Sequence, residues 1–540
     1  MKPIARAGTE LPKISNEPPA SILFVDIAGE RGLSHVYDNG MQGVNLMVEA
    51  TGGGAGWLDF DGDGHWDLYL NQGGEPTQPS DRLADQLFRN TDGERFESVT
   101  AAARIHETRY GQGVAIGDFD SDGFDDIYVT NVGRNTLLRN NGDGTFGDVT
   151  LAAGVGDERW STSAAWADLD HDGFVDLYVC NYCDYDPAAP IPCLRDGEPR
   201  ICHPKDIPPV PDEFFRNRGN GTFTAEAVER GLVGLQNRGL GVVTADFDND
   251  GDSDVYVAND TTANFLFDND GTGHFIEVGT LRGCAVDRNG ATQASMGLAC
   301  GDFDGDGWLD LYSTHFYRES NTLYRCLGKT GYEDVTAQVG LHLPTLNVLG
   351  FGTVMADFDL NGHPELFVTN GHIDPTKTMD AGGYAMQPQL FSFDGHRWHD
   401  LSVSAGEHFS REFVGRGVAS CDFDADGDTD LCVVHQNASV ALLENRSKHG
   451  NWLQLRPIGT SGDRRATGCR ATLYVGERAL MQELCGGTSF ASSHQPILTW
   501  GLGDWDGPCT LEIRWSKGNV ERLDNVTPNQ RLTRIEPNGP

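Results

Sequence analysis

The chain has 540 residues, a length that fits one large and one small domain and allows a sizeable core. It carries 40 basic against 80 acidic residues, a net charge of −40, so nucleic acid is excluded as the expected partner because no basic stripe is available. No apolar run approaches the roughly 18 residues of a membrane helix, and we expect no membrane span.

The N-terminal segment 1–20 is polar, contains proline and lacks the apolar core of a signal peptide. We expect a tail there, on a chain that either stays in the cell or begins after a removed signal. The next run, ILFVDIAGERGL at 22–33, resembles FGDVTLAAGV at 146–155. It is therefore predicted to be a strand that belongs to a repeat elsewhere in the chain.

An acidic nonapeptide then recurs at intervals of 50 to 78 residues, and a module at such a period indicates a repeat architecture. The seven copies are DFDGDGHWD (59–67), DFDSDGFDD (118–126), DLDHDGFVD (168–176), DFDNDGDSD (246–254), DFDGDGWLD (302–310), DFDLNGHPE (357–365) and DFDADGDTD (422–430).

Short β-prone runs flank each copy. Segments of small residues such as GQGVAIG precede it, and runs such as LYL, IYV and LFV follow it, so each loop is predicted to join two strands of a hairpin. Most repeats carry a second hairpin, for example TLLRNNGDGTFGDVT at 136–150. Two hairpins make a four-stranded sheet, and seven sheets make an all-β, seven-bladed propeller, which we place at 21–448.

The two ends of this region support a closed ring. The seventh repeat runs through VALLEN at 440–445 but lacks the outer strand that reads FxDVT elsewhere. The orphan run at 22–33 would supply that strand, which would close the ring and hide a sheet edge.

The loops have the chemistry of a site for a hard cation. Carboxylates at positions one, three, five and nine, a glycine at position six and a backbone carbonyl at position seven match the first nine positions of an EF-hand loop, so we expect about seven Ca²⁺ sites. Mg²⁺ is disfavoured because it keeps more waters. A plain acidic turn is the alternative, and seven copies in register argue against it.

Five ligand positions per loop follow from this reading. The first are Asp59, Asp118, Asp168, Asp246, Asp302, Asp357 and Asp422. The third are Asp61, Asp120, Asp170, Asp248, Asp304, Asp359 and Asp424. The fifth are Asp63, Asp122, Asp172, Asp250, Asp306, Asn361 and Asp426. The seventh, through the carbonyl, are His65, Phe124, Phe174, Asp252, Trp308, His363 and Asp428. The ninth are Asp67, Asp126, Asp176, Asp254, Asp310, Glu365 and Asp430.

The sixth loop departs from the pattern at Asn361 and Glu365, and we expect a weaker site there. All seven sites are closed, so the metal's expected role is structural: each ion would pin the hairpin of one blade and stabilise the fold by mass action.

Twelve cysteines favour an oxidising compartment. Cys180, Cys183, Cys193 and Cys202 cluster in an insertion of the third repeat. We predict a Cys193–Cys202 disulfide, with a zinc site or free thiols as alternatives. Zinc is disfavoured because the second closely spaced cysteine pair of a zinc ribbon is absent. Cys421 and Cys432 flank the seventh loop and could pair, as could two of Cys469, Cys485 and Cys509.

The repeats resemble the FG-GAP, or VCBS, repeats of integrin α-subunit propellers. The segment from Asn451, with NWLQLRPIGTSGDRRATGC, QELCGGTSFASSH, TWGLG and IRWSKG, resembles the ASPIC/UnbV domain, although Thr467 and Lys517 depart from its pattern. Together they resemble the cartilage-acidic-protein-1-like family, which implies an acidic, secreted or surface-associated, Ca²⁺-binding protein. Six or seven short strands at 449–540 predict a small β-sandwich packed on the propeller.

A ligand is expected at the channel mouth opposite the acidic loops, on Arg109, Gln112, Arg159, Trp160, Arg238, Gln293 and Arg416. The alternative is that these residues are solvated loop side chains and channel-wall hydrogen bonds. We expect a monomeric recognition module for a protein or glycan, in an extracellular, periplasmic or cell-surface setting. The rival is a glycan lyase, hydrolase or biosynthetic enzyme acting at the same mouth, although the sequence has no GxSxG, HExxH or phosphate loop.

Overall fold

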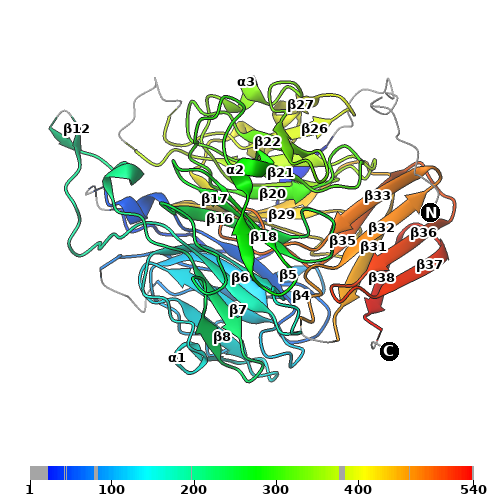
Figure 1. Ribbon diagram of the computed structural model, residues 1–540, viewed down its shortest axis with the longest axis horizontal. Coiled ribbons are helices and arrows are strands. Elements are labelled where there is room, and N and C mark those ends of the chain that lie inside the picture. The colour runs from blue at the N-terminus through cyan, green and yellow to red at the C-terminus, as the bar shows by residue number, and fades with distance from the viewer. Residues whose placement is uncertain are drawn as a thin grey trace.

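Seven four-stranded antiparallel sheets follow one another along the chain in the computed structural model of the protein (Figure 1). The structure describes residues 22–41, 43, 45–77, 83–195, 197–375, 383–460 and 463–537. The expected N-terminal tail at 1–20 lies outside these residues.

The strands of the first four sheets run from the centre outward. They are β2 (Ala55–Leu58), β3 (Asp67–Leu70), β4 (Gln86–Thr91) and β5 (Arg95–Ser98); β6 (Gly111–Gly117), β7 (Asp126–Asn131), β8 (Thr136–Asn140) and β9 (Phe146–Asp148); β10 (Ser161–Ala167), β11 (Asp176–Asn181), β14 (Glu213–Asn217) and β15 (Phe223–Ala225); and β16 (Gly239–Ala245), β17 (Asp254–Asn259), β18 (Phe265–Asn269) and β19 (Phe275–Glu277).

The last three sheets repeat this order. They are β20 (Leu298–Gly301), β21 (Asp310–Ser313), β22 (Thr322–Cys326) and β23 (Tyr332–Asp334); β24 (Gly350–Ala356), β25 (Glu365–Asn370), β26 (Gln389–Phe393) and β27 (Trp398–Asp400); and β28 (Gly415–Cys421), β29 (Asp430–His435), β30 (Ala441–Asn445) and β1 (Phe24–Asp26).

The ring closes as the sequence predicts. β1 pairs antiparallel with β30, with Val25 opposite Glu444, so the N-terminal strand completes the seventh sheet. The innermost strand β2 contacts both β6 of the next sheet and β28 of the last sheet. The fold is therefore a closed seven-bladed β-propeller. In the sheet that joins both ends of the ring, β1 covers the edge that β30 would otherwise expose.

Small residues let the innermost strands approach one another around the channel. A Cβ atom added at Gly113 in β6 would lie 2.5 Å from the carbonyl oxygen of Thr162 in β10, so glycine is required at this contact. Further out, large apolar side chains of adjacent sheets pack into separate clusters, for example Trp166, Phe215 and Phe223 between the second and third sheets. The core of the propeller thus lies between its sheets.

Short helical turns and one small hairpin connect the strands. They are α1 (Thr150–Ala153), α2 (Gly279–Arg282), α3 (His342–Thr345), η1 (Met47–Ala50), η2 (Pro204–Asp206), η4 (Ser402–Ser404), η5 (Glu407–Ser410), and the hairpin β12 (Leu194–Arg195) and β13 (Glu198–Pro199). Among the described helices, none has the length and apolar character needed to cross a membrane.

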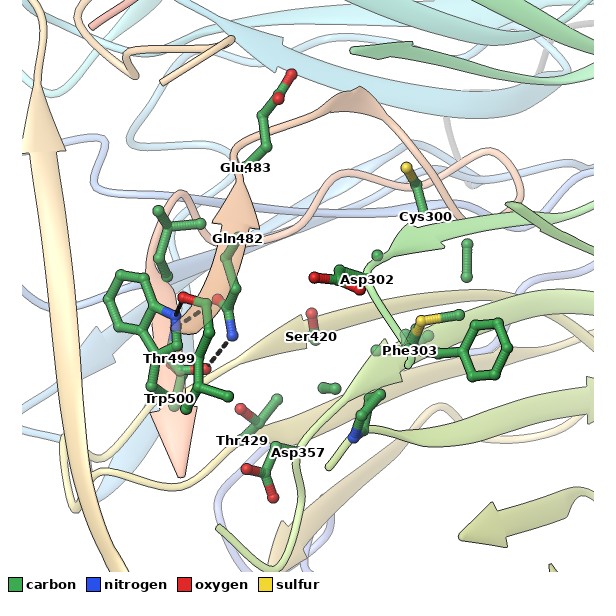
Figure 2. A pocket seen from close by; sticks show the side chains of 18 of the residues that line it. Cys300, Asp302, Phe303, Asp357, Ser420, Thr429, Gln482, Glu483, Thr499 and Trp500 are labelled. Carbon is green, nitrogen blue, oxygen red and sulfur yellow. Dashed lines mark hydrogen bonds between the residues drawn. The ribbon is translucent and has the colours of Figure 1, made fainter. Parts of the chain in front are cut away.

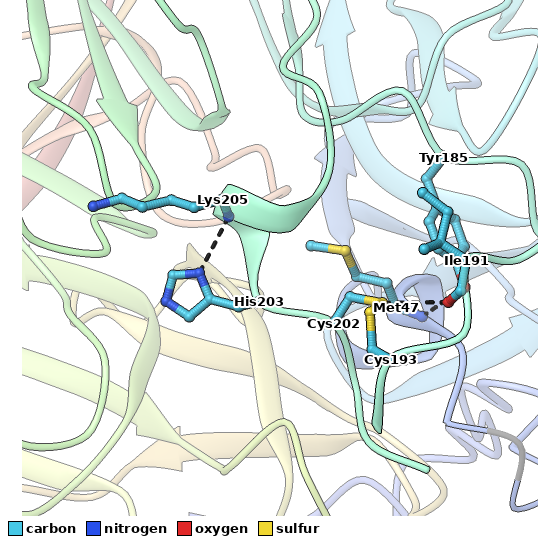
Figure 3. The surroundings of a disulfide bond; sticks show 7 residues. All are labelled: Met47, Tyr185, Ile191, Cys193, Cys202, His203 and Lys205. Atoms are coloured by element: carbon cyan, nitrogen blue, oxygen red, sulfur yellow. Dashed lines mark hydrogen bonds between the residues drawn. A yellow bond between two sulfur atoms is a disulfide. The ribbon is translucent and has the colours of Figure 1, made fainter. Parts of the chain in front are cut away.

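The cysteines behave only partly as predicted. Cys193 and Cys202 form a disulfide that closes the β12–β13 hairpin, which confirms the prediction and leaves no four-cysteine zinc site (Figure 3). The suggested Cys421–Cys432 pair is wrong: both thiols are free, because the strand register places Cys432 opposite Ala419 and not opposite Cys421. Cys469, Cys485 and Cys509 are also free.

The C-terminal part forms a small β-sandwich beside the propeller (Figure 1). One sheet has the order β35 (Leu498–Gly503), β31 (Asn451–Ile458) and β38 (Gln530–Ile535), and the other β33 (Arg478–Glu483), β32 (Arg470–Val475), β36 (Cys509–Arg514) and β37 (Val520–Val526). Buried side chains including Leu453, Trp500 and Leu511 fill the space between them. One further strand, β34 (Gly486–Gly487), leaves this sandwich and pairs with β16 as a fifth strand of the fourth propeller sheet.

Candidate metal-binding loops and the domain docked on them

Each acidic loop joins the innermost strand of a sheet to its second strand, and its carboxylates hold the backbone in a tight turn. In the second loop, Asp118 Oδ1 accepts the N–H of Asp122 at 3.1 Å and Asp118 Oδ2 accepts that of Gly123 at 3.0 Å. Asp122 Oδ1 accepts the N–H of Phe124 at 3.1 Å. Gly123 has φ +95°, a conformation that favours glycine and explains its fixed place at position six.

The ninth residue ties the loop to the third strand of its own sheet. Asp126 Oδ2 accepts the N–H of Phe119 at 3.1 Å, and Asp126 Oδ1 accepts the N–H of Asn140 at 2.8 Å. The other ninth-position aspartates make the same two bonds, and Glu365 bonds Phe358 N–H and the Ser392 hydroxyl instead. A cation would therefore share these oxygens with backbone donors.

Carboxylate oxygens gather closely in the loops. Groups of three lie with one oxygen each within 4.8 Å of the others, and two more groups exist besides these: Asp59, Asp61 and Asp67; Asp118, Asp120 and Asp122; Asp168, Asp170 and Asp176; Asp246, Asp248 and Asp250; Asp302, Asp304 and Asp306. Burial, and after it the neighbouring carboxylates, raise the pKa of Asp118 and of Asp302 to about 7. Ionised together, these groups repel, and a divalent cation would relieve that repulsion.

Third-position carboxylates keep buried oxygen atoms without a hydrogen-bond donor among the described residues. The atoms are Asp61 Oδ1, Asp120 Oδ1, Asp304 Oδ1, Asp359 Oδ2 and Asp424 Oδ1. Buried polar atoms are otherwise almost always bonded, so an orphaned anionic oxygen in the same place in five repeats fits a cation better than an acidic turn.

The seventh-position side chains point away from the carboxylates in several loops. Phe124, Phe174 and Trp308 lie against Gly142, Gly219 and Gly328, which are glycines of the second hairpin turn in the same repeat. This placement agrees with a position whose side chain is free to vary.

An arginine in the third strand reaches the loop in four repeats. Arg89 contacts Asp61 at 2.6 Å and Asp63 at 2.8 Å, and Arg139 contacts Asp120 at 2.5 Å and Asp122 at 2.9 Å. Arg216 and Arg325 do the same in the third and fifth repeats. The corresponding residues elsewhere are Asp268, Ser392 and Glu444. Sequence reasoning missed these arginines, although LFRN, LLRN and FFRN repeat visibly.

The asparagine at the next position of the third strand joins neighbouring sheets in five repeats. Asn140 Nδ2 donates to the carbonyl oxygen of Phe60, in the acidic loop of the preceding sheet, at 2.8 Å. Asn90, Asn217, Asn269 and Asn445 make the equivalent bond to Phe423, Phe119, Leu169 and Phe358. The loops are thus also the places where adjacent sheets are fastened together.

The C-terminal sandwich docks on the acidic loops through arginines. Arg531 Nη2 donates to Asp422 Oδ2 at 2.6 Å, and Arg465 contacts Asp125 at 2.8 Å. Arg456 lies 3.3 Å from Asp59, and Arg514 pairs with Asp246. Three first-position carboxylates, Asp59, Asp246 and Asp422, therefore face cationic side chains of the sandwich.

The segment after β33 enters the central channel and fills it. Gly487 pairs with Val243 of β16, Ser489 bridges to Leu298 of β20, and Ser493 bridges to Gly56 of β2. Phe490, at its tip, is 1% exposed and packs against Phe351 with ring centroids 5.0 Å apart. We call residues 486–496 the plug. GGTSFASSH was visible in the sequence as a motif, but no local pattern indicates that it occupies the channel.

The predicted ligand-mouth residues are engaged with other groups of the protein. Gln112 accepts from the Thr51 hydroxyl and from Trp160 Nε1. Arg238 donates to the carbonyl oxygens of Pro204 and Ile207, and Gln293 bonds Ser320 and Thr322.

Arg416 is fully buried, donates to backbone carbonyls and lies 4.0 Å from the ring centre of Phe351. Only Arg109 and Arg159, paired with Glu107 and Asp157, keep 26% and 28% of their side chains exposed.

A cavity of about 1160 Å³ lies between the sandwich and the fifth and sixth propeller sheets. Figure 2 shows Asp302 and Asp357 of the acidic loops on one side and Gln482 and Trp500 of the sandwich on the other. The cavity is therefore part of the domain interface and lies on the acidic-loop face, not at the opposite mouth.

The fold and its loops define a class, the β-propellers with repeated acidic hairpin loops. Residues 59–129, 118–179, 209–257, 246–313 and 302–368 match the FG-GAP-like repeat, and residues 459–540 match the ASPIC and UnbV domain. The chain belongs to the FG-GAP-like repeat family and ends in an ASPIC and UnbV domain.

Similar proteins include cartilage acidic protein 1 of Xenopus tropicalis, 26% identical over 325 residues, which cover 55% of this chain and 46% of that protein. The Homo sapiens protein of that name is 26% identical over 322 residues, which cover 57% of this chain and 45% of that protein. The chain thus spans about half the length of these relatives.

A solved Agrocybe aegerita lectin that recognises non-reducing terminal N-acetylglucosamine is 15% identical, with a TM-score of 0.38, and the match covers 67% of this chain and 88% of that one. The propeller fold is therefore assigned from the strand pairing of this protein and not from its similarity to the lectin.

Proposed function

We propose that the protein is a calcium-stabilised propeller that recognises a protein or glycan outside the cytoplasm, with the metal in a structural role. The observation that carries the metal assignment is the set of orphaned carboxylate oxygens at the third position of five loops. The donor set is all oxygen and strongly anionic, which suits Ca²⁺.

Ca²⁺ would be held by the carboxylates of positions one, three and five. The ninth carboxylate would bind it through the lone pairs that its hydrogen bonds to the backbone do not use. When bound, it supplies charge neutralisation at the hairpin. The chain's own residues do the rest: the ninth carboxylate fixes the third strand, and the following asparagine fastens the next sheet. Ion binding and sheet packing are therefore coupled through one loop.

Recognition is proposed for the mouth opposite the sandwich, because the acidic-loop face is covered by the C-terminal sheets. Arg109 and Arg159 are the candidate contacts there, since their side chains remain partly exposed. The disulfide-closed hairpin β12–β13 extends from the third sheet, on the far side of the propeller from the sandwich (Figure 1). This disulfide supports a location in an oxidising compartment.

Two experiments test the proposal separately. Metal analysis after dialysis against Ca²⁺ should find several ions per chain, and fewer than two would refute the metal assignment. A glycan and surface-protein binding screen, run in Ca²⁺ and in chelator, should find a ligand whose binding falls in the Arg109→Ala and Arg159→Ala variants. Binding that survives both substitutions would place recognition elsewhere.

A further inference from the structure

Two thiols meet where the plug leaves the sandwich. Cys485 lies between β33 and β34, and Cys300 lies in β20 of the fifth propeller sheet. Both side chains pack against the same cluster of buried residues at the domain interface, and the neighbouring Cys485 thiol is the first cause that raises the pKa of Cys300. In Figure 2 the Cys300 side chain points from β20 toward the chain that leaves β33.

These two cysteines differ from the other free thiols of the described residues. Eight of those ten thiols are buried, and only Cys300 and Cys485 are partly exposed. Both line the cavity of about 1160 Å³ between the domains, so a small molecule in that cavity can reach them. The two most accessible thiols therefore line one cavity and pack against one cluster.

The backbone around the pair is held in register. Leu298 N–H donates to the Ser489 carbonyl oxygen at 2.8 Å, and Ser489 N–H donates back at 2.5 Å. The following strand pairing of Gly487 with Val243 fixes the other side of the same segment. Both of these attachments follow Cys485 in the chain, and just before it Leu484 N–H donates to the Cys469 carbonyl oxygen at 2.9 Å. The backbone is therefore held on each side of Cys485, as a cross-link with Cys300 requires.

We propose that Cys300 and Cys485 form a reversible disulfide that locks the plug in the channel. In thiol–disulfide exchange with a small disulfide such as oxidised glutathione, the Cys485 thiolate displaces one glutathione and forms a mixed disulfide. Cys300 then attacks that bond and releases the second glutathione. One S–S bond breaks, one forms, and the two protein thiol protons end on two glutathione thiols.

The consequence is a covalent link between two domains that otherwise meet through hydrogen bonds, ion pairs and the packing of Phe490 on Phe351. The link closes at the residue where the plug begins, so it would prevent the plug from leaving the channel. Cation binding does not enter this argument, and the proposal stands apart from the metal assignment.

The test treats the full native chain with oxidised glutathione, alkylates the remaining thiols and maps disulfides by mass spectrometry without reduction. We expect the free-thiol titre to fall by two and a peptide joining Cys300 to Cys485 to accompany the Cys193–Cys202 peptide. Cys300→Ser should leave Cys485 as a glutathione adduct, whereas Cys432→Ser should leave the cross-link unchanged. Stable glutathione adducts on both cysteines of the wild-type chain would overturn the proposal.

A second measurement does not depend on any cysteine variant. A protease site is placed between 446 and 449, in the segment that joins the propeller to the sandwich. After cleavage, the oxidised protein should run as one band on a non-reducing denaturing gel and as two bands after reduction. Two bands from the oxidised sample would show that no link forms between the domains.

Discussion

Arg531 of the last strand donates a 2.6 Å hydrogen bond to Asp422, the first residue of the seventh acidic loop. Asp422 also accepts from Gln454 Nε2 at 2.9 Å, so one carboxylate is shared between the propeller and the sandwich. A carboxylate that binds a cation and an arginine has to divide its oxygens between them. Domain docking and ion binding are therefore expected to compete at this loop.

We predict that Arg531→Gln raises the Ca²⁺ affinity of the seventh loop by roughly five- to tenfold, about 1–1.4 kcal/mol, because the freed carboxylate oxygen becomes available to the ion. Calcium titration calorimetry measures the change. Arg522→Gln, an arginine on β37 whose carboxylate partners, Glu512 and Asp524, belong to the sandwich itself, is the matched control and should leave affinity unchanged. Equal affinity in both variants would contradict competition.

A second prediction concerns the third loop position. Asp304→Asn should reduce the stabilisation that Ca²⁺ confers by about 1–3 kcal/mol, because it removes one anionic ligand. In chelator the same variant should lose no stability, because burial raises the pKa of Asp304 and makes its charge unfavourable there. Thermal unfolding in both conditions measures this. Asp143→Asn, at an exposed turn, should leave stability unchanged in both conditions. If Asp304→Asn lowered stability in chelator only, Asp304 would be a structural residue and not a metal ligand.

The sheet-joining asparagines give a third prediction. Asn140→Ala removes the bond to the Phe60 carbonyl oxygen and leaves a buried acceptor unpaired, which should cost about 1–3 kcal/mol of unfolding free energy. Its neighbour Asn141 is exposed, so Asn141→Ala should cost much less. Denaturant unfolding of the two variants compares them directly, and equal costs would mean that the bond between sheets contributes nothing.

Filling of the channel gives a fourth prediction. Phe490→Ala should lower the unfolding free energy by about 3–5 kcal/mol, because it opens a cavity beside Phe351 in a buried cluster. Leu281→Ala, at a side chain that is 84% exposed, is the control for loss of an apolar side chain. A cost below 1 kcal/mol for Phe490→Ala would indicate that the plug contributes little to stability.

A fifth prediction is a pH dependence centred on two stacked histidines. The rings of His408, His435 and Phe413 all contact one another, with the two histidine centroids 5.4 Å apart. Burial lowers the pKa of His408 to about 3 and of His435 to about 4. Both folded-state pKa values lie below the unfolded value near 6.5, so the unfolded chain binds more protons between them. Stability from these residues is therefore present above pH 6.5 and is lost as the pH falls toward 4.

His408→Phe should reduce the stability lost between pH 7.5 and pH 5 by about 2 kcal/mol relative to the unaltered chain. Unfolding of the variant and of the unaltered chain is measured at both pH values in the same Ca²⁺ concentration. The loop carboxylates are the same in both proteins, so their contribution cancels in the difference between them. His274→Phe, at an exposed turn, should leave the pH dependence unchanged. A variant with the full wild-type loss would exclude the stacked pair as its source.

Local repetition made most of the propeller predictable. The acidic loops carry glycine at a fixed sixth position, and each is followed by a strand, so hairpins and sheets follow from the spacing. Ring closure by residues 24–26 follows from the likeness of 22–33 to the outer strand of other repeats. The arginine–asparagine pair of the third strand was equally repetitive, but its role depends on which side chain meets which loop.

The contacts between the domains had no such signal. Arg531 meets Asp422, and Phe490 meets Phe351, across more than a hundred residues of chain. Neither pair belongs to a repeat, because the sandwich occurs only once in the chain. It contacts the seven sheets of the ring in different ways. A single sequence records repetition well, whereas a unique contact between distant residues leaves no periodic trace.

The pairing of β1 with β30 also sets an order of events during synthesis. About 420 residues separate the two strands, so at 5–20 residues per second the first strand waits roughly 20 to 80 s on the ribosome before its partner emerges. The plug is made later still. Each nascent chain therefore exposes an unpaired strand first and an open channel second, and the cell must protect both until the last ninety or so residues arrive.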